Sequence, residues 1–354
     1  MNKKLPVWFG SVFLVMLLAS LSCNVFTNLA GSGSELESTL PPVQTVELTP
    51  PAVQAAPTAE TLPTQPAASQ PDEEPSPTAA PQVGSSQPAC EDEICTYDHV
   101  FVLKRPIGEG GRYTIVPTAR FGTYDRGLKA GRHGVSFLNS TGTPVLAAAD
   151  GKVVLSGNDS SVPQALYKNY YGNLVILEHH LDGHQEPIYT LYGHLSQTLV
   201  EKGDQVKAGE PVGLVGSTGD VGGSTLDFEV RFGEDNYNAA RNPELWLQPI
   251  PDESGELQGA LAGRVLDSQG KYVSIDNIVI ERLAGPGQRA LDTKYLKTYA
   301  ENRLKGTDPW QESFAIGDMP AGSYQITFYY GPDLVQRVVE IQPGELTVVT
   351  IQLP

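Results

Sequence analysis

The sequence lacks positive charge over a long N-terminal stretch. Between Lys4 and Lys104 there is no lysine or arginine, although acidic residues are scattered through the same stretch. Over all 354 residues, 24 Lys and Arg stand against 41 Asp and Glu, so the formal net charge is −17. Nucleic-acid binding needs cationic side chains that neutralise phosphates. We therefore exclude nucleic acid as a partner.

Cysteine is scarce, and the first of the three cysteines ends an apolar N-terminal segment. Residues 1–23 begin with lysines, continue through an apolar run and close on small residues up to Cys23, which is the pattern of an export signal. Three outcomes stay open: lipidation of Cys23, which its place directly after Ser22 favours, cleavage to a soluble product, and an uncleaved span. We expect an exported cell-envelope protein, anchored to the membrane on its extracytoplasmic side by the lipid or the signal.

The other two cysteines, Cys90 and Cys95, form an even pair in what would be an oxidising compartment. We favour a small disulfide loop. Metal binding is the alternative, for which His99 is the only further ligand nearby in the sequence.

Large apolar side chains are rare between residues 24 and 89, where Pro, Thr, Ala, Ser, Gln and Glu dominate. Such a stretch buries too little apolar surface to offset its conformational entropy. We predict a disordered linker that acts as a semi-rigid stalk.

Amphipathic helices are also missing beyond the cysteine pair, and short β-type runs broken by glycine take their place. The pattern predicts a lead-in at 90–118, an antiparallel all-β domain at 119–250 and, after a turn-rich linker, a small β-sandwich at 256–354. The stretch Ala290–Gly306 fits either a short helix or a long hairpin.

Glycine-centred motifs between 131 and 246 carry a family resemblance. They are Gly134-Val135, Thr143-Pro144-Val145, Ala149-Asp150-Gly151-Lys152-Val153-Val154, Tyr171-Gly172-Asn173, Tyr192-Gly193-His194-Leu195, Val206-Lys207-Ala208-Gly209, Val212-Gly213, Gly216-Ser217-Thr218-Gly219 and Phe228-Glu229-Val230-Arg231. In order and spacing this set resembles the lysostaphin-type (LytM-like) zinc metallopeptidases, which cut peptide cross-bridges in bacterial cell walls. The resemblance implies a LytM-type β-sheet domain.

The resemblance also implies a zinc site, and here the sequence departs from the family. Zinc is held there by two histidines and an aspartate, and the matching positions are Arg132, Ser136 and Asp227. A further histidine that helps to activate the water corresponds to Thr225, and among the pocket histidines only His194 is kept. Catalytic zinc needs about three His, Cys or carboxylate ligands, whereas an arginine stays cationic at every relevant pH. We therefore expect no metal, no cofactor and no intact catalytic site.

Two alternatives remain for the arginine. In the late strand, apolar residues alternate with Thr225, Asp227, Glu229 and Arg231, which predicts a half-buried strand. Asp227 is then on the face that points toward the former zinc pocket. Arg132 either pairs with Asp227, with a hydrogen bond from Ser136, or points into solvent.

Other histidines offer weaker metal ligands. His133 lies next to the lost position, but one step along a strand turns a side chain to the opposite face. His179, His180 and His184 lie on a separate strand and turn, where solvated histidines are the favoured interpretation.

The C-terminal part carries a second resemblance, on Gly263-Arg264-Val265, Met319-Pro320-Ala321-Gly322-Ser323-Tyr324 and Val338-Val339-Glu340-Ile341. These resemble the carboxypeptidase regulatory-like (transthyretin-like) sandwiches of surface proteins. Tyr295, Tyr299 and Trp310 form either a sugar-stacking patch or, as we favour, part of a covered sandwich edge.

Three functions compete. The leading one is a non-enzymatic envelope protein, a pseudo-metalloendopeptidase whose old groove binds peptidoglycan or regulates a cell-wall hydrolase. The second is a zinc peptidase that acts on peptidoglycan with rearranged ligands such as His133, Asp227 and His194. The third is a structural surface scaffold.

Overall fold

The computed structural model describes residues 89–91, 93–123, 131–285, 287–299 and 304–354. The predicted signal segment with Cys23, and all of the predicted stalk except its last residue, lie outside these ranges. Within them the chain forms strands and two short 3-10 helices, η1 (Tyr237–Ala239) and η2 (Pro243–Leu245), with no α-helix. The prediction of an all-β fold is confirmed. None of the helices in the described ranges has the length and apolar character needed to cross a membrane.

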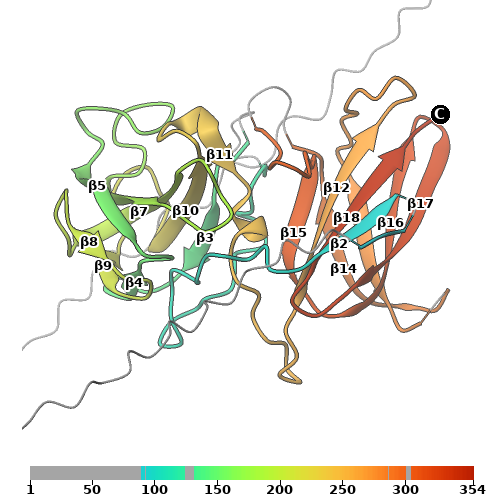
Figure 1. Cartoon of the computed structure of the whole chain (residues 1–354), viewed down its shortest axis with the longest axis horizontal. Helices are drawn as coiled ribbons and strands as arrows, with labels where there is room; N and C mark the ends of the chain where they lie inside the picture. Colours follow the sequence, from blue (N-terminus) through green and yellow to red (C-terminus); the bar gives the residue numbers. More distant parts are fainter. Residues whose placement is uncertain (1–88, 92, 124–130, 286, 300–303) are drawn as a thin grey trace, which may run out of the picture. The chain divides into compact units, whose positions relative to one another are not determined.

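A nine-stranded antiparallel sheet forms the first part of the fold (Figure 1). Its strands are β3 (Val135–Leu138), β4 (Pro144–Leu146), β5 (Gly151–Asn158), β6 (Asn173–His179), β7 (Ile188–Thr198), β8 (Gln205–Val206), β9 (Pro211–Val215), β10 (Thr225–Phe232) and β11 (Ala240–Arg241). The main path runs β11-β10-β7-β6-β5-β8, with β3 beside β10 and β9 between β4 and β7.

The central strands of this sheet are covered on both faces. On β6, Val175 and Leu177 pack in one apolar cluster with Phe228 of β10, whereas Leu174 and Ile176 pack in a second cluster on the opposite face. Successive strand residues point to opposite faces, so an uninterrupted apolar run indicates a strand that is buried on both sides.

Two further sheets form a β-sandwich. One has the order β1-β2-β18-β12-β15 and the other β14-β13-β16-β17. The strands are β1 (Ala89–Glu91), β2 (Ile94–Tyr97), β12 (Gly259–Leu266), β13 (Ile278–Leu283), β14 (Ala290–Leu296), β15 (Phe314–Met319), β16 (Gly322–Tyr330), β17 (Asp333–Ile341) and β18 (Leu346–Gln352). Leu261, Ile280, Ile326 and Val349 belong to the apolar core of this part.

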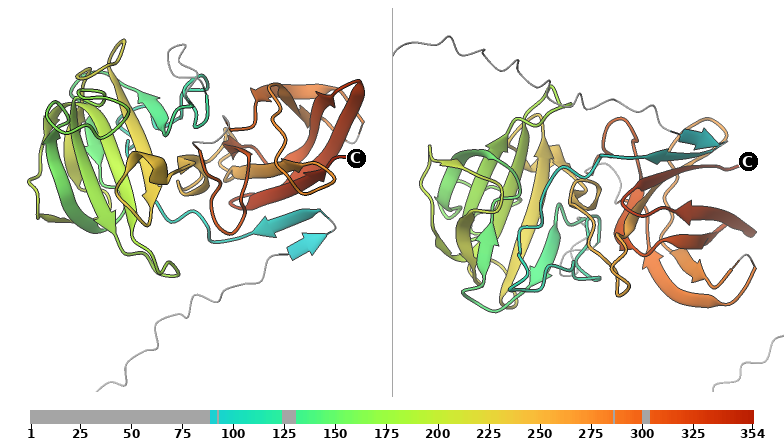
Figure 2. Two further views of the ribbon diagram at one scale, coloured as in Figure 1. Left: turned by 90° about the horizontal axis from the view of Figure 1, so that it is seen from above. Right: turned by 60° about the horizontal axis from the view of Figure 1, so that its bottom comes forward.

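Three features of the sandwich go beyond the sequence prediction or correct it. Strand β18 pairs with β12 in parallel. Strand β2 pairs with β18, so the start of the predicted lead-in at 90–118 is part of a sandwich sheet, and the cyan and red strands run side by side in Figure 2. Ala290–Leu296 is a strand paired with β13, which decides for the hairpin in the described part of that stretch.

The outer face of one sandwich sheet packs into the core of the first domain. Ala260, Ala262 and Ala315 lie in the same apolar cluster as Leu103 and Phe137, and all of them belong to one compact unit, Thr78–Pro354. Small side chains allow this close packing between sheets. Charged pairs border it, namely Arg105 with Asp318 and Arg120 with Glu244.

Candidate functional site

Strand β10 places the candidate site between two neighbours. Asp227 has Ser136 of β3 as its register partner on one side and Gly193 of β7 on the other. The residue after Gly193 is His194, so three strands bring Asp227, Ser136 and His194 together. Arg132 approaches from the segment that precedes β3.

Arg132 forms an ion pair with Asp227. Its Nη1 lies 2.7 Å from Asp227 Oδ2 and donates a hydrogen bond of 3.1 Å to Ser136 Oγ. Ser136 Oγ in turn donates to Asp227 Oδ1 at 2.5 Å. The side chains of Arg132 and Asp227 are 15% and 8% exposed, so the pair is largely removed from water. The structure therefore has the ion pair rather than a solvent-directed arginine.

His194 completes the cluster from a strained backbone. Its φ of 63° is in the left-handed region that residues with a side chain rarely adopt, and its side chain is fully buried. Nδ1 lies 2.9 Å from the carbonyl oxygen of Thr218, and Nε2 lies 3.2 Å from Asp227 Oδ2. A carbonyl only accepts, so Nδ1 carries a proton, and Nε2 can donate to Asp227 only when it is protonated as well.

Two opposing effects act on the pKa of Asp227. Burial raises it, but the charges of His194 and Arg132 outweigh burial and hold the pKa well below its ordinary value. Asp227 is therefore an anion whose charge is already neutralised by protein groups.

Thr225 is also committed to the fold, because its Oγ1 donates to the carbonyl of Phe137 at 3.1 Å.

These groups do not fit a catalytic zinc ion. Zinc needs about three protein ligands from His, Cys and carboxylate. Arg132, Ser136 and Thr225 supply none of these, while Asp227 and His194 supply two at most. Across the described ranges of the chain, no group of three or more His, Cys, Asp or Glu is arranged to hold a metal ion.

The other histidines are engaged elsewhere. His133 Nδ1 lies 2.7 Å from the carbonyl oxygen of Tyr237, and its ring stacks on Tyr237 at 3.5 Å. His179 is fully buried, with its ring nitrogens 2.8 Å from Asp150 O and Thr190 Oγ1, so the prediction of solvation is wrong for it. Its imidazole is part of the strand packing.

Sequence reasoning missed a second charged cluster on β10. Arg231 is fully buried; its Nε donates to Glu229 Oε2 at 3.0 Å and its Nη1 to Asp235 Oδ1 at 2.8 Å. The hydroxyl of Tyr171 also donates to Glu229. All residues from Thr225 to Arg231 are buried, so the prediction of a half-buried strand is wrong. The spacing of Glu229 and Arg231, two residues apart on one face, is the only sequence signal for this pair.

The three aromatic residues suggested for sugar stacking do not form one patch. Tyr295 on β14 is 71% exposed. Tyr299 packs edge-on against Phe121, and Trp310 against Tyr97. Tyr299 and Trp310 therefore contribute to packing.

Cys90 and Cys95 are joined by a disulfide across the β1–β2 hairpin.

Comparison with known proteins places this domain in a family. Residues 130–239 match peptidase family M23. The chain is 42% identical over 99 residues to the cell division protein DipM of Caulobacter vibrioides. The matched stretch is 28% of this chain and 14% of that protein. Over 108 residues the chain is 39% identical to the murein hydrolase activator EnvC of Escherichia coli, covering 30% and 22%.

A third relative is the glycyl-glycine endopeptidase ALE-1 of Staphylococcus capitis, which is 31% identical over 176 residues, covering 47% of this chain and 45% of that protein. The chain thus spans less than half the length of each of these relatives.

Proposed function

Because residues 130–239 form a LytM-like domain of peptidase family M23, we propose that this chain is a non-catalytic cell-envelope protein whose groove binds peptidoglycan or a cell-wall hydrolase. The groove is the surface around Arg132, Ser136, His194, Thr225 and Asp227. In this proposal the domain keeps the family's fold and has given up the family's metal.

The ion pair between Arg132 and Asp227 carries the proposal. Both residues stand at positions that match zinc ligands of the family, and they are 2.7 Å apart. A guanidinium remains cationic at any relevant pH, so a divalent metal would meet a fixed positive charge at one of its ligand positions. Without the metal there is no polarised carbonyl and no metal-bound hydroxide at neutral pH.

The relatives fall into two groups, and the site chemistry of this chain favours one of them. ALE-1 is named as an endopeptidase and EnvC as a murein hydrolase activator. The domains of both are similar to this one in sequence, so identity alone does not separate cleavage from regulation. The replaced ligands support the regulatory role, and with it a partner that is peptidoglycan or an envelope hydrolase.

A membrane tether belongs to the same proposal. Cys23 as a lipidation site, or the signal segment itself, would hold the chain at the membrane, and the stalk would space the folded part from it. Both lie outside the described residues.

The alternative of a zinc peptidase with rearranged ligands has less support. It needs His133 together with Asp227 and His194, but the ring of His133 stacks on Tyr237 and bonds to the Tyr237 carbonyl. The alternative of a plain scaffold predicts no affinity for the cell wall.

Sedimentation with purified cell-wall sacculi tests the proposal. We expect the protein to pellet with sacculi without releasing soluble wall fragments, and to pellet less when the groove variant Arg132→Glu is used. A folded protein that stays in the supernatant in the presence of both sacculi and envelope hydrolases favours the scaffold. Release of fragments by the purified protein contradicts the proposal.

A further inference from the structure

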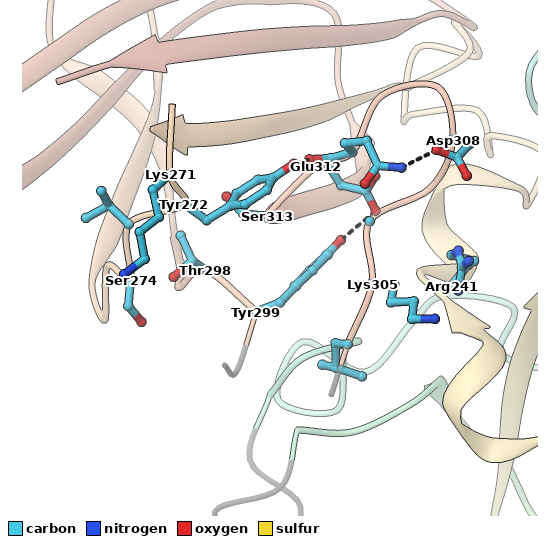
Figure 3. A pocket seen from close by; sticks show the side chains of 14 residues that line it. Arg241, Lys271, Tyr272, Ser274, Thr298, Tyr299, Lys305, Asp308, Glu312 and Ser313 are labelled. Atoms are coloured by element: carbon cyan, nitrogen blue, oxygen red, sulfur yellow. Dashed lines mark hydrogen bonds between the residues drawn. The ribbon is translucent and has the colours of Figure 1, made fainter. Parts of the chain in front are cut away.

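A cavity lies apart from the candidate site, where β11 meets the loops of the sandwich. Its volume is about 730 Å³, and its lining includes Arg241, Lys305, Glu312, Tyr272 and Tyr299 (Figure 3). Small-molecule sites in proteins have volumes of roughly 300–1,000 Å³. None of the five groove residues lines this cavity.

Arg241 is a buried cation that has no anionic partner at ion-pair distance among the residues that the structure describes. The residue is 9% exposed; its Nη1 donates to the carbonyl oxygens of Ala239 and Ala240 at 3.1 Å each, and its guanidinium lies over the Phe232 ring. Its Nε is buried with no hydrogen-bond partner, and no carboxylate of the described residues lies within ion-pair distance. Asp308 and Glu312 act on Arg241 only beyond ion-pair distance, and burial outweighs them and lowers the pKa of Arg241. A buried charge without a direct partner is costly, so an anion from outside would be favoured here.

Glu312 is a buried acid in the same cavity. It is 2% exposed and accepts hydrogen bonds from the Thr307 amide at 2.7 Å and from the Tyr299 hydroxyl at 3.2 Å. No cation of the described residues pairs with it. Burial raises the pKa of Glu312 to about 7. The cavity thus contains a buried cation and a buried acid that are not bonded to each other.

The other charged residues of the cavity limit the class of ligand that it can bind. Lys271, Lys305 and Asp308 also line the cavity, so both signs are present. Two carboxyl groups disfavour a multiply charged anion such as phosphate, and three cationic side chains disfavour a simple cation. A ligand with one group of each sign satisfies both.

Space for a chain-like ligand continues past Arg241. A neighbouring hollow of about 580 Å³ shares Arg241 and Lys305 with the cavity and also includes Glu186 and Asn236. The two hollows therefore adjoin at Arg241 and Lys305.

We propose that this cavity binds a short peptide with a free carboxylate and a free amine, the carboxylate on Arg241 and the amine toward Glu312. The site is separate from the groove, and its occupant does not depend on the groove's function. Tyr272, which is half-exposed at the cavity, offers a ring for the peptide's apolar side chains.

Calorimetric titration of the full chain with trialanine tests the proposal, at about pH 8 so that Glu312 is ionised. We expect saturable binding, with a Kd on the order of 1 mM or tighter. N-acetyl-trialanine lacks the ammonium and trialanine amide lacks the carboxylate, so each should bind roughly 10- to 100-fold more weakly. Binding by either enantiomer of trialanine supports the proposal, and a preference for the D form identifies cell-wall peptide as the source.

Variants that remove one charge each assign the two ends of the peptide. Arg241→Gln should weaken the binding of trialanine but leave the weak binding of trialanine amide unchanged. Glu312→Gln should also weaken the binding of trialanine but leave the weak binding of N-acetyl-trialanine unchanged. Lys207→Gln, an exposed residue away from the cavity, is the control for charge. If Arg241→Gln does not fold, Lys305→Gln on the exposed rim should still weaken trialanine.

The proposal is overturned if no trialanine form binds saturably, or if both Arg241→Gln and Glu312→Gln, folded as judged by circular dichroism, bind trialanine as tightly as the unaltered protein.

Discussion

Arg132, from the segment before β3, meets Asp227 of β10, with Nη1 and Oδ2 2.7 Å apart and Ser136 hydrogen-bonded to both side chains. Asp227 also has His194 Nε2 at 3.2 Å, so two basic side chains converge on one carboxylate. The segment before β3 is thus joined to β10 by an ion pair that is largely excluded from water.

Removal of the Arg132 side chain should lower the free energy of unfolding. Arg132→Met leaves the buried Asp227 carboxylate with Ser136 and His194 as its remaining partners. Breaking one side of a buried ion pair costs about 3 kcal/mol. We expect the free energy of unfolding, measured by urea denaturation, to fall by about that amount.

A matched exposed pair provides the control for Arg132→Met. Lys207 and Asp150 are also 2.7 Å apart, but their side chains are 76% and 59% exposed. Lys207→Met should leave stability almost unchanged. Equal effects from both variants would show that the Arg132 pair has no special role.

A close contact between two glycines positions the turn that contacts His194. Gly172 and Gly219 have φ of +66° and +77°, and a Cβ on Gly219 would lie 2.4 Å from the Gly172 amide nitrogen. Gly219 follows Thr218, whose carbonyl oxygen contacts His194 Nδ1. Gly219→Ala should cost about 3 kcal/mol, because the backbone conformation and the contact both become unfavourable.

The control for Gly219→Ala is close in sequence. A Cβ added to Gly222 would have no atom within 4 Å, so Gly222→Ala should change the free energy of unfolding by less than about 0.5 kcal/mol. A stable Gly219→Ala variant would contradict the packing described for this turn.

Glu312 should make stability depend on pH near neutrality. Its pKa is about 7 in the folded protein against an ordinary value of 4.5, because it is buried. Between these values the folded state holds the proton more tightly than the unfolded state, so stability is complete below pH 4.5 and is lost as the pH rises through 7. The loss is about 3 kcal/mol, since one pKa unit corresponds to about 1.4 kcal/mol.

Unfolding measured from about pH 5 to pH 8 checks this dependence. Glu312→Gln should flatten the curve, whereas the exposed Glu201→Gln should not. An unchanged slope in Glu312→Gln would mean that other groups set the pH dependence.

Much of the fold follows from local patterns in the sequence. Apolar runs such as Leu174–Leu177 predict strands because β-branched and leucine side chains fit a sheet that is covered on both faces. The pairing of β2 with β18 was not predictable in the same way. The two strands are separated by most of the chain, and nothing local in either strand specifies its partner.

The candidate site was predictable only in part. The family spacing placed Arg132 and Asp227 at one pocket, but the sequence alone left the arginine free to point into solvent. The buried pair of Glu229 and Arg231 escaped prediction because the residues read as a polar, solvated strand face, and only the covering chain around Tyr171 shows that they are buried.

Zinc content of the purified protein after dialysis tests the central claim most directly. We predict no stoichiometric zinc in the unaltered chain, because Arg132 occupies a ligand position and only Asp227 and His194 remain as potential ligands. The variant with Arg132→His, Ser136→Asp, Thr225→His and Asp227→His should bind about one equivalent, because it restores the ligand types that zinc requires. About one equivalent of zinc in the unaltered protein, held in the groove beside His194, would contradict the account.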